Sequence, residues 1–192
     1  RLLSLGTESP ISSHAPSMST ESLTISPLEQ YLSKAAWILK GPIGASDFKA
    51  YIFPMLFFKR ISDVYDEEYQ TALDESGGDE EYAALPEFHR FVIPEGCHWD
   101  DVRETTSNIG LKIESCLREI ESANQEHLYG IFGDAQWSNK EKLPDRLLTD
   151  LVEHFSQYTL STALVARDML GQAYEYLIKH FADLTNKKAG EF

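Results

Sequence analysis

Apolar residues recur at steps of three and four along most of this chain, the spacing that places them on one face of an α-helix. The pattern predicts a short helical turn near Leu128 and five longer helices, over residues 27–39, 47–73, 108–123, 143–158 and 161–184. The stretch from Phe91 to Pro94 has the character of a brief extended segment and leaves room for one small hairpin. The expected fold class is therefore all-α, an irregular bundle of five or six helices.

The first helix has signals at both ends. Ser26 is expected to cap it, Pro27 to occupy its first position, and the turn from Gly41 to Gly44 to end it. Tyr31 and Trp37 fall toward the edges of its apolar stripe. The stripe itself consists of Leu28, Leu32, Ala35, Ala36 and Leu39.

The second helix is apolar around most of its circumference between Phe48 and Ile61, a pattern typical of a helix at the centre of a bundle. Ser46 is expected to cap it, and Pro54 removes a backbone donor and predicts a bend. We expect the core to be built on this helix and the last one. The apolar positions of the last helix are Leu170, Ala173, Tyr174, Leu177, Ile178 and Phe181.

The organisation of the chain follows from its length and composition. With 192 residues and 42% hydrophobic content, it is expected to bury one substantial core, over residues 27–185. Residues 1–26, rich in serine and threonine, are expected to be a flexible leader, and residues 74–87 an acidic loop. Residues 186–192 are expected to form a short basic linker. No apolar run approaches the roughly 20 residues that span a bilayer, so no membrane segment is expected.

The net charge of −14 argues against an autonomous nucleic-acid-binding domain, which usually carries a basic face. The charge is unevenly distributed along the chain. Residues 28–60 contain five basic and two acidic residues, a net charge of +3, whereas residues 63–104 contain two basic and fourteen acidic residues, a net charge of −12. The first segment suits the approach of a phosphate backbone and the second repels it, unless both are simply solvated faces.

The usual catalytic signatures are missing from the sequence, which has no glycine-rich phosphate loop, no His-Glu-x-x-His and no Gly-x-Ser-x-Gly. Cys97, His98 and Cys116 do not have the paired spacing of a four-ligand zinc site, so no metal is expected. Two cysteines are too few for a disulfide scaffold, which predicts reduced thiols in a cytoplasmic protein. We therefore expect no catalytic residue in this chain.

Several short motifs occur in a characteristic order. They are Trp37-Ile-Leu-Lys-Gly41, Asp47-Phe-Lys49, Leu56-Phe-Phe-Lys-Arg-Ile-Ser-Asp63, Val92-Ile-Pro-Glu95, Trp99-Asp100, Asp168-Met-Leu-Gly-Gln-Ala-Tyr-Glu-Tyr-Leu177 and Gly190-Glu-Phe192. Together they resemble the N-terminal helical domain of the modification subunit, a methyltransferase, of type I restriction-modification systems. The resemblance covers residues 28–192.

This resemblance implies a longer parent enzyme that moves a methyl group from S-adenosylmethionine to the exocyclic amine of adenine in DNA, a base that must first be flipped out of the duplex. The catalytic domain would follow residues 186–192, with Gly190, Glu191 and Phe192 at the edge of the cofactor site. The implied partners are a specificity subunit, a second modification subunit, a restriction subunit and duplex DNA. The helical domain itself would serve subunit assembly and clamping around DNA, without binding the cofactor alone.

The candidate DNA contacts are the basic residues Lys40, Lys49, Lys59, Arg60, Lys187 and Lys188. Two structural alternatives stay open: Lys59 and Arg60 as a solvated pair, and Gly171 as a point of close helix approach. The free chain should bind duplex DNA only at about 10⁻⁴ M or more weakly. The competing hypothesis is a freestanding helical adaptor that binds a protein partner.

Overall fold

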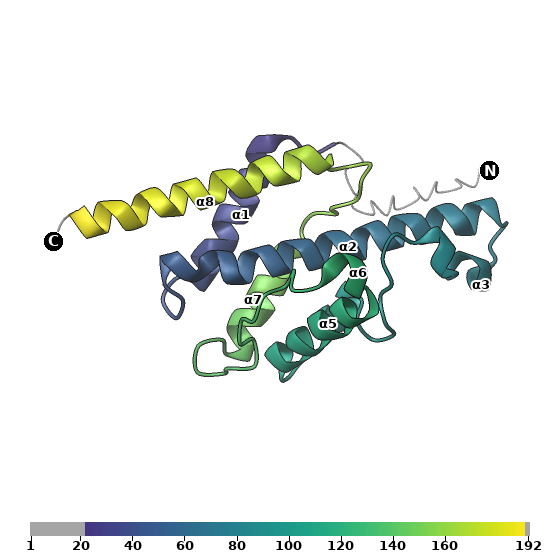
Figure 1. The fold of residues 1–192 in the computed structure, drawn as a ribbon, viewed down its shortest axis with the longest axis horizontal. Coiled ribbons are helices and arrows are strands. Elements are labelled where there is room, and N and C mark those ends of the chain that lie inside the picture. Colours follow the sequence, from purple (N-terminus) through teal and green to yellow (C-terminus); the bar gives the residue numbers. More distant parts are fainter. Residues whose placement is uncertain (1–21, 191–192) are drawn as a thin grey trace, which may run out of the picture.

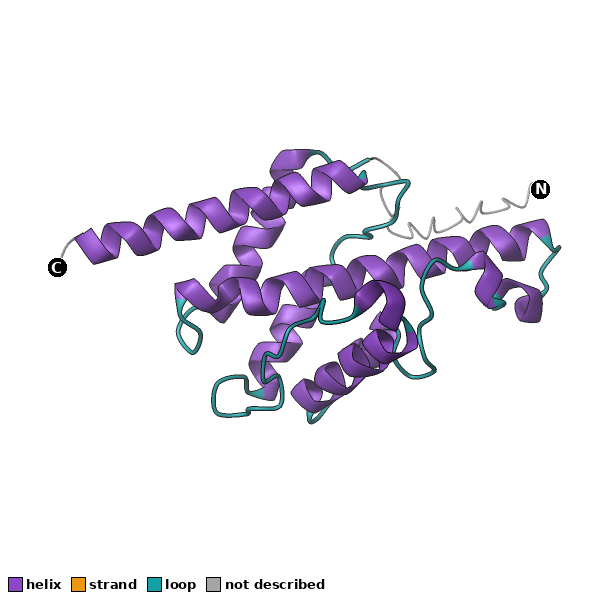
Figure 2. Ribbon diagram, viewed as in Figure 1, coloured by secondary structure: helices purple, strands orange, loops and turns teal. Residues whose placement is uncertain are grey.

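The computed structural model describes the backbone of residues 22–190 and the side chains of residues 22–180. These residues form eight α-helices and two short 3-10 helices and contain no strand (Figures 1 and 2). The long helices are α1 Ile25–Leu39, α2 Phe48–Glu75, α5 Ile109–Ala123, α7 Asp145–Phe155 and α8 Arg167–Gly190. The short ones are η1 Ala45–Asp47, α3 Glu80–Ala83, η2 Pro86–Phe88, α4 Trp99–Arg103 and α6 Gln125–Leu128. The predicted all-α class is confirmed, and the short helices account for the larger number.

Helix α2 runs through the centre of the molecule, as its apolar circumference predicts (Figure 1). Pro54 lies inside the helix and is itself buried. Apart from Pro54, the apolar side chains that α2 buries are Phe48, Ile52, Met55, Leu56, Phe58, Ile61 and Ala72. Helices α1, α5 and α7 contribute many of the other core residues, and α4, α6, α8 and the loops between the helices supply the remainder.

Helix α8 contributes less to the core than its sequence pattern predicts. It packs chiefly against α1, and among its described side chains only Ala173 and Leu177 are buried. Ile178, expected to face inward, is 38% exposed. Figure 1 shows the C-terminal half of α8 running past the edge of the bundle. Over the described side chains, the core is built more on α1, α2, α5 and α7 than on α8, so the prediction that it rests on the second and the last helix is correct for α2 and wrong for α8. The side chain of Phe181 lies outside the described residues.

Several predicted helix boundaries are also wrong. α1 begins at Ile25, so Ser26 lies inside the helix and does not cap it. Ser46 lies in the 3-10 turn η1 rather than at the cap of α2. The predicted acidic loop contains α3, because the side chain of Asp79 accepts a hydrogen bond from the backbone N–H of Tyr82 at 3.0 Å and caps a new helix.

The small hairpin that the sequence allowed near Phe91 does not form among the described residues, and a single side chain holds a loop there. The side-chain amide of Asn124 donates to the carbonyl of Val92 at 2.8 Å and accepts from its N–H at 2.9 Å. These are the two backbone bonds that a neighbouring strand would supply, so Asn124 satisfies the extended backbone without a second strand.

Tyr31, expected at the edge of α1, lies instead in the contact between α1 and α7. Its hydroxyl donates to the carbonyl of Phe155 at 2.7 Å, and its own carbonyl accepts a hydrogen bond from His154 Nε2 at 2.6 Å. The rings of Tyr31 and His154 stack with centroids 5.2 Å apart. This reciprocal pairing fixes α1 on α7 and leaves both residues buried.

The burial of His154 predicts a pH-dependent stability. Desolvation lowers its pKa from the usual 6.5, so the folded protein holds a neutral ring. As the pH falls below about 6.5, His154 becomes protonated in the unfolded chain but stays neutral in the folded protein. The free energy of unfolding therefore decreases. His154→Gln should cost about 1–2 kcal/mol at pH 7, through the lost hydrogen bond and packing. Urea denaturation at pH 7 and pH 5 measures the free energy of unfolding of the wild type and of His154→Gln. The difference between the two proteins should be smaller at pH 5, and a difference that does not change with pH would contradict this role.

Candidate functional site

The motif Leu56-Phe-Phe-Lys-Arg-Ile-Ser-Asp63 lies in the middle of α2 and supplies polar side chains to the interior. Lys59 and Asp63, one turn apart, form a buried ion pair. The carboxylate of Asp63 also accepts the backbone N–H of Leu160 at 2.7 Å. A buried pair of this kind is stable only when additional hydrogen bonds satisfy its remaining atoms, and Leu160 supplies one.

Arg60 anchors the segment that joins α7 to α8. Its Nη1 donates to the carbonyls of Leu160, Ser161 and Val165 at 2.8, 3.0 and 2.8 Å. These contacts hold residues 160–165 outside any helix, which explains why α8 begins at Arg167 and not at Ser161 as predicted.

Glu67 binds the same segment from the next turn of α2. Its carboxylate accepts the backbone N–H groups of Thr162 and Ala163, each at 3.0 Å, and the hydroxyl of Thr162. Partial burial raises the pKa of Glu67, but these hydrogen bonds outweigh it, so the pKa lies below its usual value. Glu67 is therefore an anion that binds the connection between α7 and α8 at Thr162 and Ala163.

Ser62 connects the same part of α2 to α4. Its hydroxyl accepts the backbone N–H of Trp99 at 2.9 Å, while the indole Nε1 of Trp99 donates to the hydroxyl of Ser156 at 2.9 Å. The Trp99 ring packs against Phe58 with centroids 5.3 Å apart. We call residues 59–67 the α2 hub, because they tie α4 and the α7–α8 connection (residues 160–165) to one helix.

Ser62 and Glu67 were not predicted from the sequence as functional parts of this hub. One signal was present: Arg60, Asp63 and Glu67 are spaced by three and four, so they lie on one face of the helix as a polar stripe. Buried polar side chains require partners, and this stripe predicts a backbone segment lying along it. Which segment lies there is a property of the tertiary fold.

Lys59 and Arg60 do not have the surroundings expected of DNA contacts. Lys59 is 4% exposed and neutralised by Asp63, and Arg60 donates to three carbonyls. Neither is the solvated pair that the sequence also allowed. Because their charge stabilises the domain itself, we do not retain these two residues as DNA-contact candidates.

Lys40 and Lys49 are exposed at the corner between α1 and α2. The ammonium of Lys40 lies 4.1 Å from the ring centroid of Trp37, which is itself 64% exposed. The backbone of Lys187 and Lys188 lies in the last turns of α8, so this part of the predicted linker is helical. In Figure 1 the corner and the end of α8 lie toward one end of the long axis, and acidic α3 lies toward the other.

The residues predicted at the edge of a cofactor site are only partly described. Gly190 is the last residue of α8, whereas Glu191 and Phe192 lie outside the described residues. Gly171 faces open space, because a Cβ added there would meet no atom within 4 Å. The expected close approach of another helix at Gly171 is therefore wrong for the described part of the chain.

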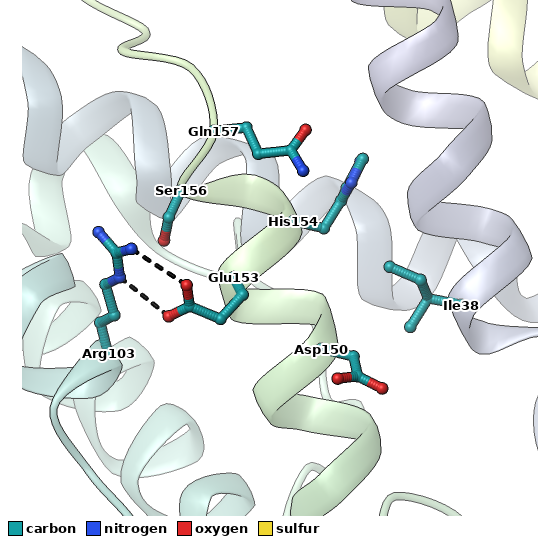
Figure 3. Close-up of a pocket in the computed structure, with 7 residues that line it drawn as sticks. All are labelled: Ile38, Arg103, Asp150, Glu153, His154, Ser156 and Gln157. Carbon is teal, nitrogen blue, oxygen red and sulfur yellow. Dashed lines mark hydrogen bonds and ion pairs between the residues drawn. The ribbon is translucent and has the colours of Figure 1, made fainter. Parts of the chain in front are cut away.

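A polar hollow of about 440 Å³ lies beside α7 (Figure 3). Arg103 and Glu153 close one side with two hydrogen bonds of 2.9 and 3.0 Å, and this pairing lowers the pKa of Glu153. His154 also lines the hollow, but its Nε2 is committed to the carbonyl of Tyr31. The arrangement has no nucleophile paired with a free base, so it does not form a catalytic site.

Both cysteines are buried, and their thiols take part in hydrogen bonds. The thiol of Cys97 donates to the carboxylate of Glu119 at 2.9 Å, and burial followed by that bond raises its pKa. Such thiols are poor nucleophiles and poor metal ligands. Over residues 22–180, no group of three histidine, cysteine or acidic side chains is placed to hold a metal ion. In the same part of the chain, no helix has the length and apolar character to cross a membrane.

Comparison with known proteins gives two positive findings. The family model of the HsdM N-terminal domain matches residues 28–155. The structure is similar to that of the methyltransferase subunit of a type I restriction-modification system from Streptococcus thermophilus, with a TM-score of 0.64 and 24% sequence identity. The similarity covers 83% of this chain and 39% of that subunit, and it shows a shared fold. No curated protein matches the chain.

Proposed function

The chain belongs to the HsdM N-terminal domain family, because the family model matches residues 28–155, and from this membership we propose that it works as the front domain of a longer type I restriction-modification methyltransferase subunit. The family match carries the proposal. The similar solved subunit supports it, since the chain corresponds to only 39% of that protein. The remainder of such a parent would hold the catalytic machinery.

The proposed activity of the parent is methylation of adenine in DNA with S-adenosylmethionine. Gly190, Glu191 and Phe192 would lie at the edge of the cofactor site, where the helical domain passes into the catalytic one. Because the substrate would be chromosomal DNA, we assign the protein to the cytoplasm. The described side chains offer no catalytic constellation of their own, so this domain's contribution would be structural.

That contribution is the assembly and clamping of subunits around DNA. The α2 hub supports this role, because its charged and polar side chains fix α4 and the α7–α8 connection (residues 160–165) to one helix. The proposed partners are a specificity subunit, a second modification subunit and a restriction subunit, with the specificity subunit reading the DNA sequence.

Two measurements test the assignment. Reading the codons that follow Phe192 in the gene should reveal a methyltransferase domain with a glycine-rich cofactor loop, and an immediate stop codon would favour the helical adaptor. Isothermal titration of S-adenosylmethionine into this chain should show no binding, while the full-length parent should bind. Micromolar binding to the chain alone would place the cofactor site inside it and contradict the proposed division of labour.

We propose that the corner formed by Lys40 and Lys49, together with Lys187 and Lys188, contacts DNA backbone in the assembled complex. The separation of this corner from acidic α3 supports the proposal, because exposed charges farther apart than about 8–10 Å are largely screened at physiological salt. Lys40→Glu with Lys49→Glu should weaken binding equally for all DNA sequences and reduce the salt slope by about 1 for each lost phosphate contact.

The matched control is Lys112→Glu with Arg118→Glu on α5, which changes the net charge by the same amount. DNA binding by the full complex is measured over a range of salt concentrations. If the corner variant and the control lose affinity equally, the effect is one of net charge, and the corner is not a contact surface.

A further inference from the structure

The two cysteines of the chain lie together, one on the loop that leads into α4 and the other in the middle of α5. The thiol of Cys116 donates to the carbonyl of Gly96, the residue before Cys97, at 3.6 Å. The thiol of Cys97 donates to Glu119, which follows Cys116 by one turn of α5, at 2.9 Å. Through these reciprocal contacts the two thiols also hydrogen-bond to each other.

The surroundings of the two thiols differ in what they do to acidity. Burial raises the pKa of both. For Cys97, the hydrogen bond to Glu119 raises the pKa further, because a carboxylate stabilises the protonated thiol. For Cys116, the hydrogen bond with Cys97 and the charge of Lys112 act in the opposite direction and lower the pKa. Cys116 is therefore the better nucleophile of the two, since the thiolate is the reactive form.

Two charged side chains of α5 flank the pair of thiols. Lys112 lies one turn before Cys116, and its ammonium nitrogen is 3.7 Å from the point where a Cβ on Gly96 would lie. A cation in this place favours the thiolate of Cys116. Glu119 is exposed, so it can take the proton of Cys97 and pass it to water. Cys97 alone is a poor nucleophile, but a carboxylate in contact with its thiol supplies the base that it needs.

We propose that Cys116 and Cys97 form an oxidation site for hydrogen peroxide, in which Cys116 reacts first and Cys97 closes an intramolecular disulfide. The thiolate of Cys116 attacks one peroxide oxygen, the O–O bond breaks, and the second oxygen takes up a proton and leaves as water. Cys97 then attacks the sulfur of the resulting sulfenic acid while its proton passes to Glu119, and the hydroxyl leaves as a second water. Two thiols and one peroxide thus give one disulfide and two waters.

The disulfide would join the loop before α4 to α5. Trp99, which opens α4, is already held by Ser62 of the α2 hub, so the bond would connect α5 to the hub through α4. A cross-link between distant residues stabilises a fold mainly by restricting the unfolded chain. We expect the melting temperature of the oxidised chain to exceed that of the reduced chain by about 5–10 °C.

Peptide mapping of the folded chain after treatment with hydrogen peroxide tests the proposal. Trypsin cleaves after Arg103 and Lys112, between the two cysteines, so the disulfide should appear as two joined peptides that dithiothreitol separates. The wild type should lose its thiols about tenfold faster at pH 8 than at pH 7, because the thiolate fraction rises tenfold for each unit below the pKa.

Serine variants separate the roles of the two cysteines. In Cys97→Ser the sulfenic acid on Cys116 has no partner thiol, so dimedone should trap it. Cys116→Ser should be labelled at least about tenfold less, because Cys97 is the weaker nucleophile. Circular dichroism and thermal melting under reducing conditions confirm the fold of each variant.

Two further variants test the flanking charges. Glu119→Gln should slow the closure of the disulfide and let dimedone label Cys116 even when Cys97 is present. Lys112→Met should slow the loss of thiols by about twofold, the size of a charge contact between neighbouring turns of one helix. Lys49→Met at the α1–α2 corner is the matched control, since it removes the same charge away from the thiols and should react like the wild type.

Three results would overturn the proposal. The first is a folded wild type whose thiols stay reduced while those of the urea-unfolded chain are oxidised. The second is dimedone labelling of Cys97 in preference to Cys116. The third is a disulfide that joins two chains in place of one within the chain.

Discussion

Replacing Gly110 with alanine is expected to destabilise the domain more than any other single methyl group added to a helix. A Cβ at this position would lie 1.9 Å from the carbonyl oxygen of Trp137 and 2.8 Å from its carbonyl carbon. Overpacking against movable side chains costs about 1–3 kcal/mol, and here the obstacle is backbone, so we expect at least about 3 kcal/mol. Urea denaturation followed by circular dichroism measures the loss.

Gly171→Ala is the matched control for this substitution. Gly171 also lies in a helix, but it is exposed and a Cβ there would meet nothing within 4 Å. Removing the backbone freedom of glycine from a helix should stabilise the protein by about 0.5–1 kcal/mol. The two substitutions should therefore have opposite signs. A cost below about 1 kcal/mol for Gly110→Ala would show that α5 does not approach the Trp137 backbone this closely.

Removing the carboxylate of Asp63 is expected to have the second large effect. Asp63→Ala leaves the ammonium of Lys59 buried without a counterion and the N–H of Leu160 without its acceptor. Breaking one partner of a buried pair costs about 3–5 kcal/mol. The loss should appear as a lower urea midpoint, and the 160–165 segment should become more susceptible to proteolysis because one of its anchors is gone.

The double substitution Lys59→Met with Asp63→Leu separates the charge effect from the packing effect. It removes both charges and leaves apolar side chains of similar size, so it should be less destabilising than Asp63→Ala alone. Some cost should remain, because the Leu160 N–H stays unpaired, which is worth about 1–3 kcal/mol. If Asp63→Ala were nearly neutral, or the double variant the worse of the two, the buried pair would not hold the hub together.

The family and the DNA-contact candidates differ in how well the sequence predicts them. The order of short motifs indicated the family, because each motif is local and can be read in one stretch. The DNA-contact candidates were chosen from charge alone, and charge does not tell whether a side chain points into or out of the fold. Lys59 and Lys49 share one helix, yet Lys59 is buried against Asp63 and Lys49 is exposed.

The amino-acid sequence by itself determined the all-α class, the five long helices and most of their buried faces. Those properties depend on the spacing of apolar residues within a few turns, and a helix satisfies its own backbone hydrogen bonds. Leu28 and Leu32 on α1, like Ile113 and Ile120 on α5, are buried as that spacing predicts.

Only the tertiary structure decided where α8 begins, what Arg60 and Glu67 bind, and why residue 110 is a glycine. Each depends on partners far away in the chain: Arg60 on the carbonyls of 160–165, Glu67 on the N–H groups of Thr162 and Ala163, and Gly110 on the backbone of Trp137. Local periodicity reports which side chains leave water, but it does not report which distant backbone groups those side chains must satisfy. That assignment is made only when α2 and the segments along it come together in the folded domain.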